Sequence, residues 1–284
     1  MATKPVLMKG ESFKKYGHKA TFPAIVEIKH DGIRVRLTLT DKGLEVESYA
    51  RKELHNIVPL LGKKGEEWLR YSGVKELDIE FLVNGNFNDT YRYVRSKVVP
   101  KDLTDADVCL IILDAPEVKE PYGIRRHTVG SYAEIGRGRF GLPTIGTFGE
   151  WVKDEAGLWD FYAWCRNGGH EGVMYKELDH EYSRKRTRTW LKVKPEETAD
   201  GKIIGINRAV SIEGVPLDRA GSITVQLEDG SIAQPAGLKH ELGADMFRNP
   251  SAYIGKWIEF KFMERDRQDG YRHPFFYRFR EDKD

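Results

Sequence analysis

The stretch EIKHDGIR at residues 27–34 places a lysine, Lys29, two residues before an Asp-Gly pair. It lies between two segments, 21–30 and 33–40, in which apolar and polar residues alternate as they do in β-strands. A lysine is normally protonated and inert, but partial desolvation or neighbouring cations lower its pKa and make it nucleophilic. Lys29 is therefore a candidate nucleophile. An exposed lysine beside an ordinary hairpin corner explains the pattern equally well, because Asp-Gly is the commonest hairpin signal.

The segments around this stretch predict an antiparallel meander. Residues 21–30 form its first strand, 33–40 its second, and a turn at Asp41-Lys42-Gly43 leads into a third at 44–49. Lys29 is expected near the end of the first strand. Arg51 follows the third strand, where it either contacts a phosphate or is a solvated arginine at a strand exit.

Length and composition set limits on the class of protein. The chain has 284 residues, enough for a large domain and a small one, and a formal net charge of only +2. Bulk charge therefore does not identify a nucleic-acid partner. Two cysteines without CxxC spacing argue against a zinc site or a disulfide scaffold. No signal-peptide pattern and no run of eighteen apolar residues occur, so we expect a soluble, cytoplasmic protein.

The remainder of the first two-thirds of the chain predicts alternating strands and helices. Strands are expected at 74–83 and 107–114, and helices at 64–71, 120–134 and 154–166. Asp78 and Glu80 share one face of the first of these strands, where two carboxylates are costly unless they meet a cation, a donor or water. A solvated strand face is the alternative.

Two later stretches carry charges suited to a phosphorylated ligand. Glu171 lies among glycines at the start of a predicted strand, where a ligand or metal can approach the backbone closely. The run at 184–194 is the densest basic stretch in the chain. Because Lys192 and Lys194 alternate with apolar residues, they share one strand face and predict a phosphate between them. A solvated charge run is the usual alternative.

Composition changes at Pro195. Short strands at about 202–208, 222–228 and 254–262, with a helical insert near 240–247, are typical of a compact barrel of the oligonucleotide-binding (OB) type. We therefore expect an α+β chain, with an antiparallel-sheet domain at 1–198 followed by a small OB-fold β-barrel domain at 199–284.

Taken in order, these motifs resemble those of the covalent nucleotidyltransferases, and most closely the small phage-type ATP-dependent DNA ligases. The resemblance covers nearly the whole chain and implies that Lys29 carries AMP. It implies nucleotide-binding roles for Glu27, Lys29, Arg34, Glu80, Leu113, Lys176, Lys192 and Lys194. Two positions depart from the family pattern: Asp78-Ile79-Glu80 replaces the commoner Asp-Gly-Glu, and Leu113 stands where an aromatic residue commonly stacks on adenine.

The same resemblance implies the remaining site residues. Glu171 and Glu80 are expected to hold a metal, and Arg51, Arg184 and Arg186 to bind DNA. The terminal segment 272–283 is expected to close over ATP and meet pyrophosphate through Arg278, Arg280, Asp282 and Lys283. The implied function is nick sealing in duplex DNA by a monomer, with ATP and Mg²⁺ as cofactors and Mn²⁺ as a substitute.

Alternatives remain open at this point. Only 28 residues precede Lys29, which favours ATP over NAD as the cofactor. An RNA ligase or an mRNA capping-type enzyme shares the lysine motif. A non-catalytic protein that binds single strands through aromatic side chains is the other class.

Overall fold

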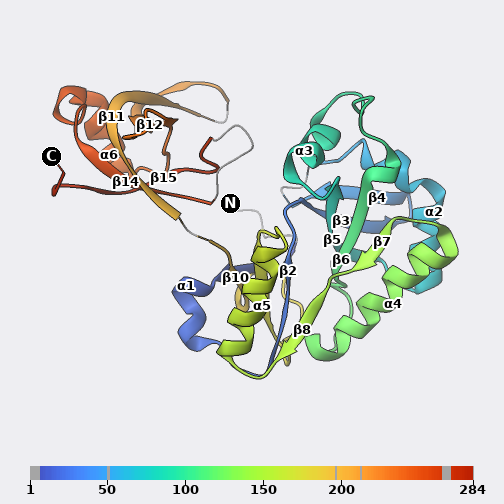
Figure 1. Cartoon of the computed structure of the whole chain (residues 1–284). Coiled ribbons are helices and arrows are strands. Elements are labelled where there is room, and N and C mark those ends of the chain that lie inside the picture. Colours follow the sequence, from blue (N-terminus) through green and yellow to red (C-terminus); the bar gives the residue numbers. More distant parts are fainter. Residues whose placement is uncertain (1–6, 50–51, 196, 212, 264–269, 284) are drawn as a thin grey trace. The chain divides into compact units, whose positions relative to one another are not determined.

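The structure is a computed structural model that describes residues 7–49, 52–195, 197–211, 213–263 and 270–283. Arg51, expected to contact DNA, lies outside the described residues. The chain divides into two compact units, Met1–Val193 and Lys194–Asp284. Figure 1 labels helices and strands of both units. No helix among the described residues combines the length and the apolar character that crossing a membrane requires.

The first unit contains two five-stranded sheets. Sheet A has the order β1 (Lys9–Ser12), β10 (Arg186–Val193), β9 (Gly172–Glu177), β2 (Ala24–Lys29) and β8 (Gly149–Val152). Sheet B has the order β4 (Gly43–Ser48), β3 (Ile33–Thr40), β5 (Glu76–Val83), β6 (Val108–Asp114) and β7 (Thr144–Gly146). All neighbouring strands are antiparallel except the pairs β1–β10 and β6–β7, which are parallel.

The helices of this unit cover the apolar faces of the sheets (Figure 1). They are α1 (Phe13–Tyr16), α2 (Ile57–Ser72), α3 (Phe87–Arg95), α4 (Tyr122–Phe140) and α5 (Glu155–Asn167), with short 3₁₀ turns at Gly17–Lys19 and Asp105–Asp107. Asp154 caps α5 by accepting a hydrogen bond from the backbone N–H of Gly157 at 3.0 Å. Trp68 of α2 donates its indole N–H to the carbonyl of Tyr132 in α4, which joins the two helices.

Alternation along the strands gives each sheet one apolar and one polar face. In sheet A, Val26, Ile28 and Val173 pack with α5, so Glu27 and Lys29 project from the opposite face. In sheet B, Leu37 and Ile79 join the core formed with α2 and α4. The acidic and basic residues of β3 and β5 therefore lie on the other face of sheet B.

The predicted meander is wrong in one respect. The strands at 33–40 and 43–48 pair as expected, but β2 pairs with β8 and β9 and belongs to the other sheet. The Asp-Gly pair is therefore a crossing between sheets and not a hairpin turn. Gly32 is required there, because a Cβ atom at this position would lie 2.3 Å from the carbonyl oxygen of Phe81.

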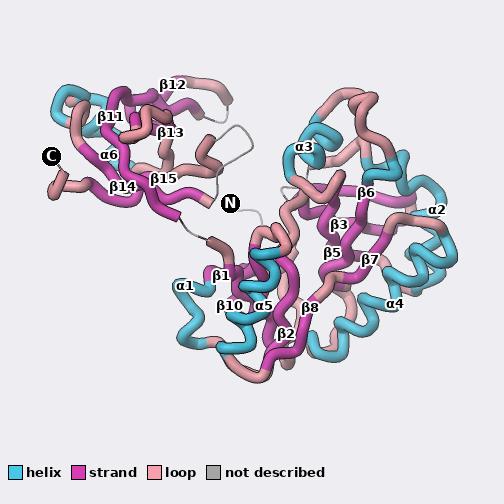
Figure 2. Tube along the Cα trace, in the orientation of Figure 1, coloured by secondary structure: helices cyan, strands magenta, loops and turns pink. Residues whose placement is uncertain are grey.

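The second unit is a small sheet with one α-helix (Figure 2). Its strands follow the order β13 (Ile232–Ala233), β12 (Pro216–Gln226), β11 (Glu197–Val210), β14 (Trp257–Phe262) and β15 (Phe275–Phe279), with α6 (His240–Arg248) and a 3₁₀ turn at Pro250–Ala252. Ile223, Met246 and Phe260 are fully buried in its core. The α+β class is confirmed. The described residues do not form a closed barrel, although single bridges join Ala236 to Ser222 and to Phe275.

Candidate active site

Lys29 is the last residue of β2 and lies opposite Gly172 of β9. This register brings Glu171, the residue before β9, next to the lysine, and the Lys29 ammonium donates to a Glu171 carboxylate oxygen. The Lys29 side chain is 20 % exposed and that of Glu171 is 5 % exposed. The amine is therefore accessible to a ligand while its acidic neighbour is sheltered from water. The sequence placed both residues at strand ends, and the structure brings them together.

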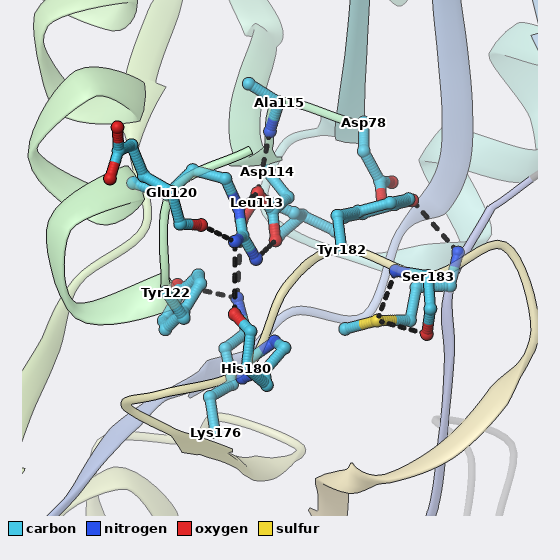
Figure 3. A network of polar contacts seen from close by, with 12 residues as sticks. Asp78, Leu113, Asp114, Ala115, Glu120, Tyr122, Lys176, His180, Tyr182 and Ser183 are labelled. Carbon is cyan, nitrogen blue, oxygen red and sulfur yellow. Dashed lines mark hydrogen bonds and ion pairs between the residues drawn. The ribbon is translucent and has the colours of Figure 1, made fainter. Parts of the chain in front are cut away.

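Glu27 lies on the same face as Lys29, two residues earlier in β2. Three groups contact its carboxylate: the Tyr122 hydroxyl donates a hydrogen bond, and the Lys176 ammonium at 2.7 Å and the Arg126 guanidinium at 3.3 Å form ion pairs with it. The Lys176 ammonium also donates to the Tyr122 hydroxyl at 2.8 Å and to the carbonyl oxygen of Leu113 at 3.3 Å (Figure 3). The Lys176 ammonium thus has three oxygen partners inside the protein, two by hydrogen bond and one by ion pair.

Aromatic rings surround the Lys176 ammonium. It lies 4.3 Å from the ring centroid of Tyr122 and 4.1 Å from that of Trp190, within cation–π range. His180 stacks on Tyr122 and accepts the indole N–H of Trp190 at Nε2, so its Nδ1 carries the hydrogen that it donates to the carbonyl of Glu177. Burial lowers the pKa of His180 to about 4, so the imidazole is neutral, as this pattern requires.

On sheet B, Arg34 forms two hydrogen bonds with Asp78, at 2.8 and 2.5 Å. Burial acts to lower the pKa of Arg34, but the charge and hydrogen bonds of Asp78 outweigh it and raise that pKa. The Tyr182 hydroxyl also donates to Asp78, at 2.7 Å (Figure 3). Of the alternatives open for Asp78, the structure shows contact with a cation and a hydroxyl donor and not a solvated strand face, because Asp78 is fully buried. Arg34 lies 5.6 Å from the Trp190 ring, so the polar faces of the two sheets approach each other here.

Glu80 accepts the backbone N–H of Gly32 at 3.0 Å, which places its carboxylate beside the crossing between the sheets. Burial raises the pKa of Glu80 to about 7, against the opposing effect of the Lys29 and Arg34 charges. The Lys29 ammonium thus contacts Glu171, and its positive charge also acts on the Glu80 carboxylate.

The raised pKa of Glu80 predicts a stability that depends on pH. Because the pKa of Glu80 is higher in the folded than in the unfolded protein, protonation of Glu80 stabilises the folded state. This stabilisation is complete below pH 4.5 and is lost as the pH rises through about 7. We expect the unfolding free energy of the original chain, relative to that of Glu80→Gln, to fall by about 1 to 3 kcal/mol over this range. Urea titrations of both chains at several pH values measure it. A constant difference would contradict the raised pKa.

Next to the buried Lys176–Glu27 pair, a second buried ion pair contacts Tyr122 and His180. Arg125 and Asp114 are fully buried and joined by two hydrogen bonds, at 2.5 and 3.0 Å. Arg125 also donates to the carbonyls of Glu120 and His180, and Asp114 accepts the N–H of Ala115 (Figure 3). These contacts join β6, the start of α4 and the loop after β9.

The cations expected to bind phosphates have different surroundings. Lys192 pairs in register with Met174, which places it on the same face of sheet A as Lys29. Lys194 follows the last residue of β10 and is the first residue of the second unit. Arg184 is 40 % exposed and forms two hydrogen bonds of 2.6 Å with Glu76. Arg186 is 51 % exposed and lies 3.6 Å from Glu11.

The terminal cations are held within the second unit by acidic residues. Arg280 donates to both oxygens of Asp200, at 2.8 and 2.7 Å, and to Asp282. The hydrogen bond from Arg280 lowers the pKa of Asp282 to about 2. Lys283 lies 3.1 Å from Asp200, and Arg278 donates to Glu259 at 2.6 Å. The segment thus forms a compact, ion-paired cluster at the end of β15.

Residues 7–194 match the family model of the ATP dependent DNA ligase domain. The chain belongs to this family. A DNA ligase of Enterobacteria phage T3 is 31 % identical over 139 residues, which are 47 % of this chain and 40 % of the phage protein. A probable DNA ligase of Kineococcus radiotolerans is 41 % identical over 58 residues, 20 % of this chain and 12 % of that protein. The chain thus aligns with less than half the length of either relative.

Solved ligase structures share the fold. One described as a Lig E DNA ligase that binds DNA with a minimal scaffold has a TM-score of 0.73 and 20 % identity, over 96 % of this chain and 98 % of that one. The ATP-dependent DNA ligase of bacteriophage T7, in complex with ATP, has a TM-score of 0.57 and 21 % identity, over 98 % of this chain and 99 % of that one. At these identities the likeness shows the fold alone.

Sequence reasoning missed several residues of the cluster around Glu27. Tyr122, Arg125 and Arg126 were predicted only as part of the helix at 120–134, and His180 was given no role. Tyr122 and Arg126 do lie in a helix that begins directly after Pro121. Nothing in its periodicity marked which side chains reach β2, because that depends on how α4 packs.

Proposed function

We propose that this chain is an ATP-dependent DNA ligase that seals nicks in duplex DNA. The observation that carries the proposal is Lys29 at the end of β2, partly exposed and in contact with the sheltered Glu171. A lysine so placed has both access to a ligand and a fixed direction of approach. Membership of the ligase family supports the choice of ATP and DNA. We also propose that the protein acts as a monomer in the cytoplasm.

The reaction begins at the Lys29 amine. After losing a proton, its nitrogen attacks the α-phosphorus of ATP, the bond to the pyrophosphate oxygen breaks, and a lysine-AMP phosphoramidate forms. AMP then passes to the 5′-phosphate at the nick, and the 3′-hydroxyl displaces AMP to form the phosphodiester bond. Most of the barrier lies in charge on the phosphates, so cations such as Lys192 and Lys194 lower it by electrostatics and positioning.

The carboxylates of Glu171 and Glu80 fit a magnesium ion whose coordination is completed by substrate. No group of three or more His, Cys, Asp or Glu residues within the described parts of the chain forms a ready-made metal site. Mg²⁺ is usually held by one or two carboxylates together with substrate phosphates. Glu171 contacts Lys29, and the Glu80 carboxylate lies within the electrostatic influence of the same amine. We propose that they hold Mg²⁺, which Mn²⁺ can replace. When bound, the ion neutralises charge on the phosphates.

We propose that residues 1–198 form the nucleotidyltransferase domain and 199–284 an OB-type domain. The bridges from Ala236 to Ser222 and Phe275 support a barrel-like closure of the small sheet. DNA would be bound through Arg51, Arg184 and Arg186, with contacts to phosphates and no sequence preference. In the terminal segment, Arg278, Arg280, Asp282 and Lys283 would meet pyrophosphate when the small domain closes over ATP.

The terminal segment gives a prediction that separates two steps of the reaction. Lys283→Ala and Arg280→Ala should slow labelling from ATP more than sealing of a pre-adenylated nick, because only the first step expels pyrophosphate. We expect about a hundredfold loss in labelling against less than about tenfold in sealing. Rapid-quench assays on both substrates measure it, with Lys239→Ala, an exposed lysine before α6, as the control. Equal losses would mean that the segment only holds DNA or the fold.

Self-labelling on a denaturing gel tests the function itself. We expect a covalent label from α-labelled ATP and sealing of nicked duplex DNA. A label from GTP alone would indicate a capping-type enzyme, and sealing of nicked RNA without DNA would indicate an RNA ligase. No label with either nucleotide would indicate a non-catalytic nucleic-acid-binding protein.

A further inference from the structure

We infer that Tyr122 is a positioning residue that makes the nucleotide site select a base with a 6-amino group. The inference rests on the proposed use of ATP and adds a residue to which no role has been given above. Tyr122 is the first residue of α4 and is 1 % exposed, and its hydroxyl bridges Glu27 and Lys176. It acts through these two side chains and not by touching the reacting atoms.

Tyr122 is held rigidly and stays protonated. Its ring stacks on His180 at 5.3 Å between centroids, and its backbone N–H donates to the carbonyl of His180 at 3.0 Å. Burial, together with the Glu27 and Asp114 carboxylates, raises the pKa of Tyr122 well above its usual value. The hydroxyl is therefore a permanent donor to Glu27, and it accepts from Lys176 at the same time.

The three groups that contact Glu27 differ in how easily a ligand could replace them. Tyr122 and Lys176 are almost fully buried, whereas the Arg126 side chain is 27 % exposed and makes the longest contact, 3.3 Å. A carboxylate offers about four lone-pair sites. A ligand donor can therefore take the place of Arg126, while Tyr122 and Lys176 continue to hold the carboxylate in its orientation.

The position of Glu27 fits the base of a nucleotide. Glu27 and Lys29 lie on one face of β2, about 7 Å apart along the strand. This spacing is comparable with the span from phosphate to base in a mononucleotide. A carboxylate held by Tyr122 and Lys176 is an acceptor only, so it pairs with the 6-amino group of adenine and repels the 6-oxo group of guanine. A site built to bond one group rejects the analogue that lacks it.

Labelling kinetics of the full chain test this inference with Tyr122→Phe and three nucleotides. The nucleotides are ATP, GTP and purine riboside triphosphate, which lacks the 6-amino group. For Tyr122→Phe we expect the KM for ATP to rise about tenfold and the preference for ATP over GTP to fall about tenfold, with kcat changed less than threefold. The KM for purine riboside triphosphate should not change, because the contact that Tyr122 supports is absent.

Tyr175→Phe is the matched control. Tyr175 is also fully buried, but it lies on the face of β9 opposite to that of Lys176. Its hydroxyl forms hydrogen bonds with the backbone of Thr21. This variant should lower the melting temperature without changing the ATP-to-GTP ratio. The inference is overturned if Tyr122→Phe keeps the original ATP-to-GTP ratio. It is also overturned if the KM of this variant rises equally for ATP and for purine riboside triphosphate.

The unaltered chain provides a test that does not depend on folding of the variant. It should prefer ATP over purine riboside triphosphate by at least about tenfold in kcat/KM. Equal use of the two nucleotides would overturn the inference while leaving ligation itself established. Absence of labelling with every nucleotide would instead refute the proposed function.

Discussion

Replacing Lys29 by alanine or by arginine is expected to abolish self-labelling from ATP. Alanine has no nucleophile, and arginine stays charged at any pH at which the protein is folded, so neither can attack phosphorus. Arginine can still pair with Glu171, which lies in contact with the Lys29 ammonium. We therefore expect Lys29→Arg to melt close to the original temperature. Gel labelling with α-labelled ATP and a melting curve measure the two effects.

The control for this prediction is Lys42→Ala, an exposed lysine in the turn before β4, which should label at the original rate. Both Lys29 variants should still seal a pre-adenylated nick to some extent, since the last step does not use the amine. Retained label on either Lys29 variant would refute its role as the nucleophile.

Arg125→Met is expected to lower the unfolding free energy by about 3 to 5 kcal/mol. The change leaves Asp114 as an uncompensated carboxylate in a site where both side chains are fully buried. It also removes donors to the carbonyls of Glu120 and His180. Urea titration followed by circular dichroism measures the loss.

An exposed pair provides the matched control for Arg125. Arg92 and Asp102 lie 2.9 Å apart with side chains 47 % and 62 % exposed, so Arg92→Met should cost less than about 1 kcal/mol. The double variant Arg125→Met with Asp114→Leu should recover most of the loss, because no buried charge remains. If Arg125→Met lowers the unfolding free energy as little as Arg92→Met does, the buried charge of Asp114 does not need Arg125 for stability.

Local sequence was sufficient to predict most strands and one side of the site. The alternation in 21–30 and 170–176 places Glu27 and Lys29 on one face and predicts a strand start beside Glu171. The shared face of Asp78 and Glu80 also followed from strand periodicity, but which partner each carboxylate meets did not. These features depend on backbone geometry over a few residues, and side-chain alternation is set by that geometry alone.

Only the tertiary structure determined which sheet each strand joins and which buried groups meet. The Asp-Gly pair has the composition of a hairpin turn, but packing separates β2 from β3 and makes Gly32 a crossing point. Tyr122 and Glu27 are 95 positions apart in the chain, and they meet because the first turn of α4 donates backbone hydrogen bonds to the carbonyls of Leu178 and His180 after β9. A buried carboxylate needs donors from any direction in space, so the sequence predicts that they exist but not where along the chain they lie.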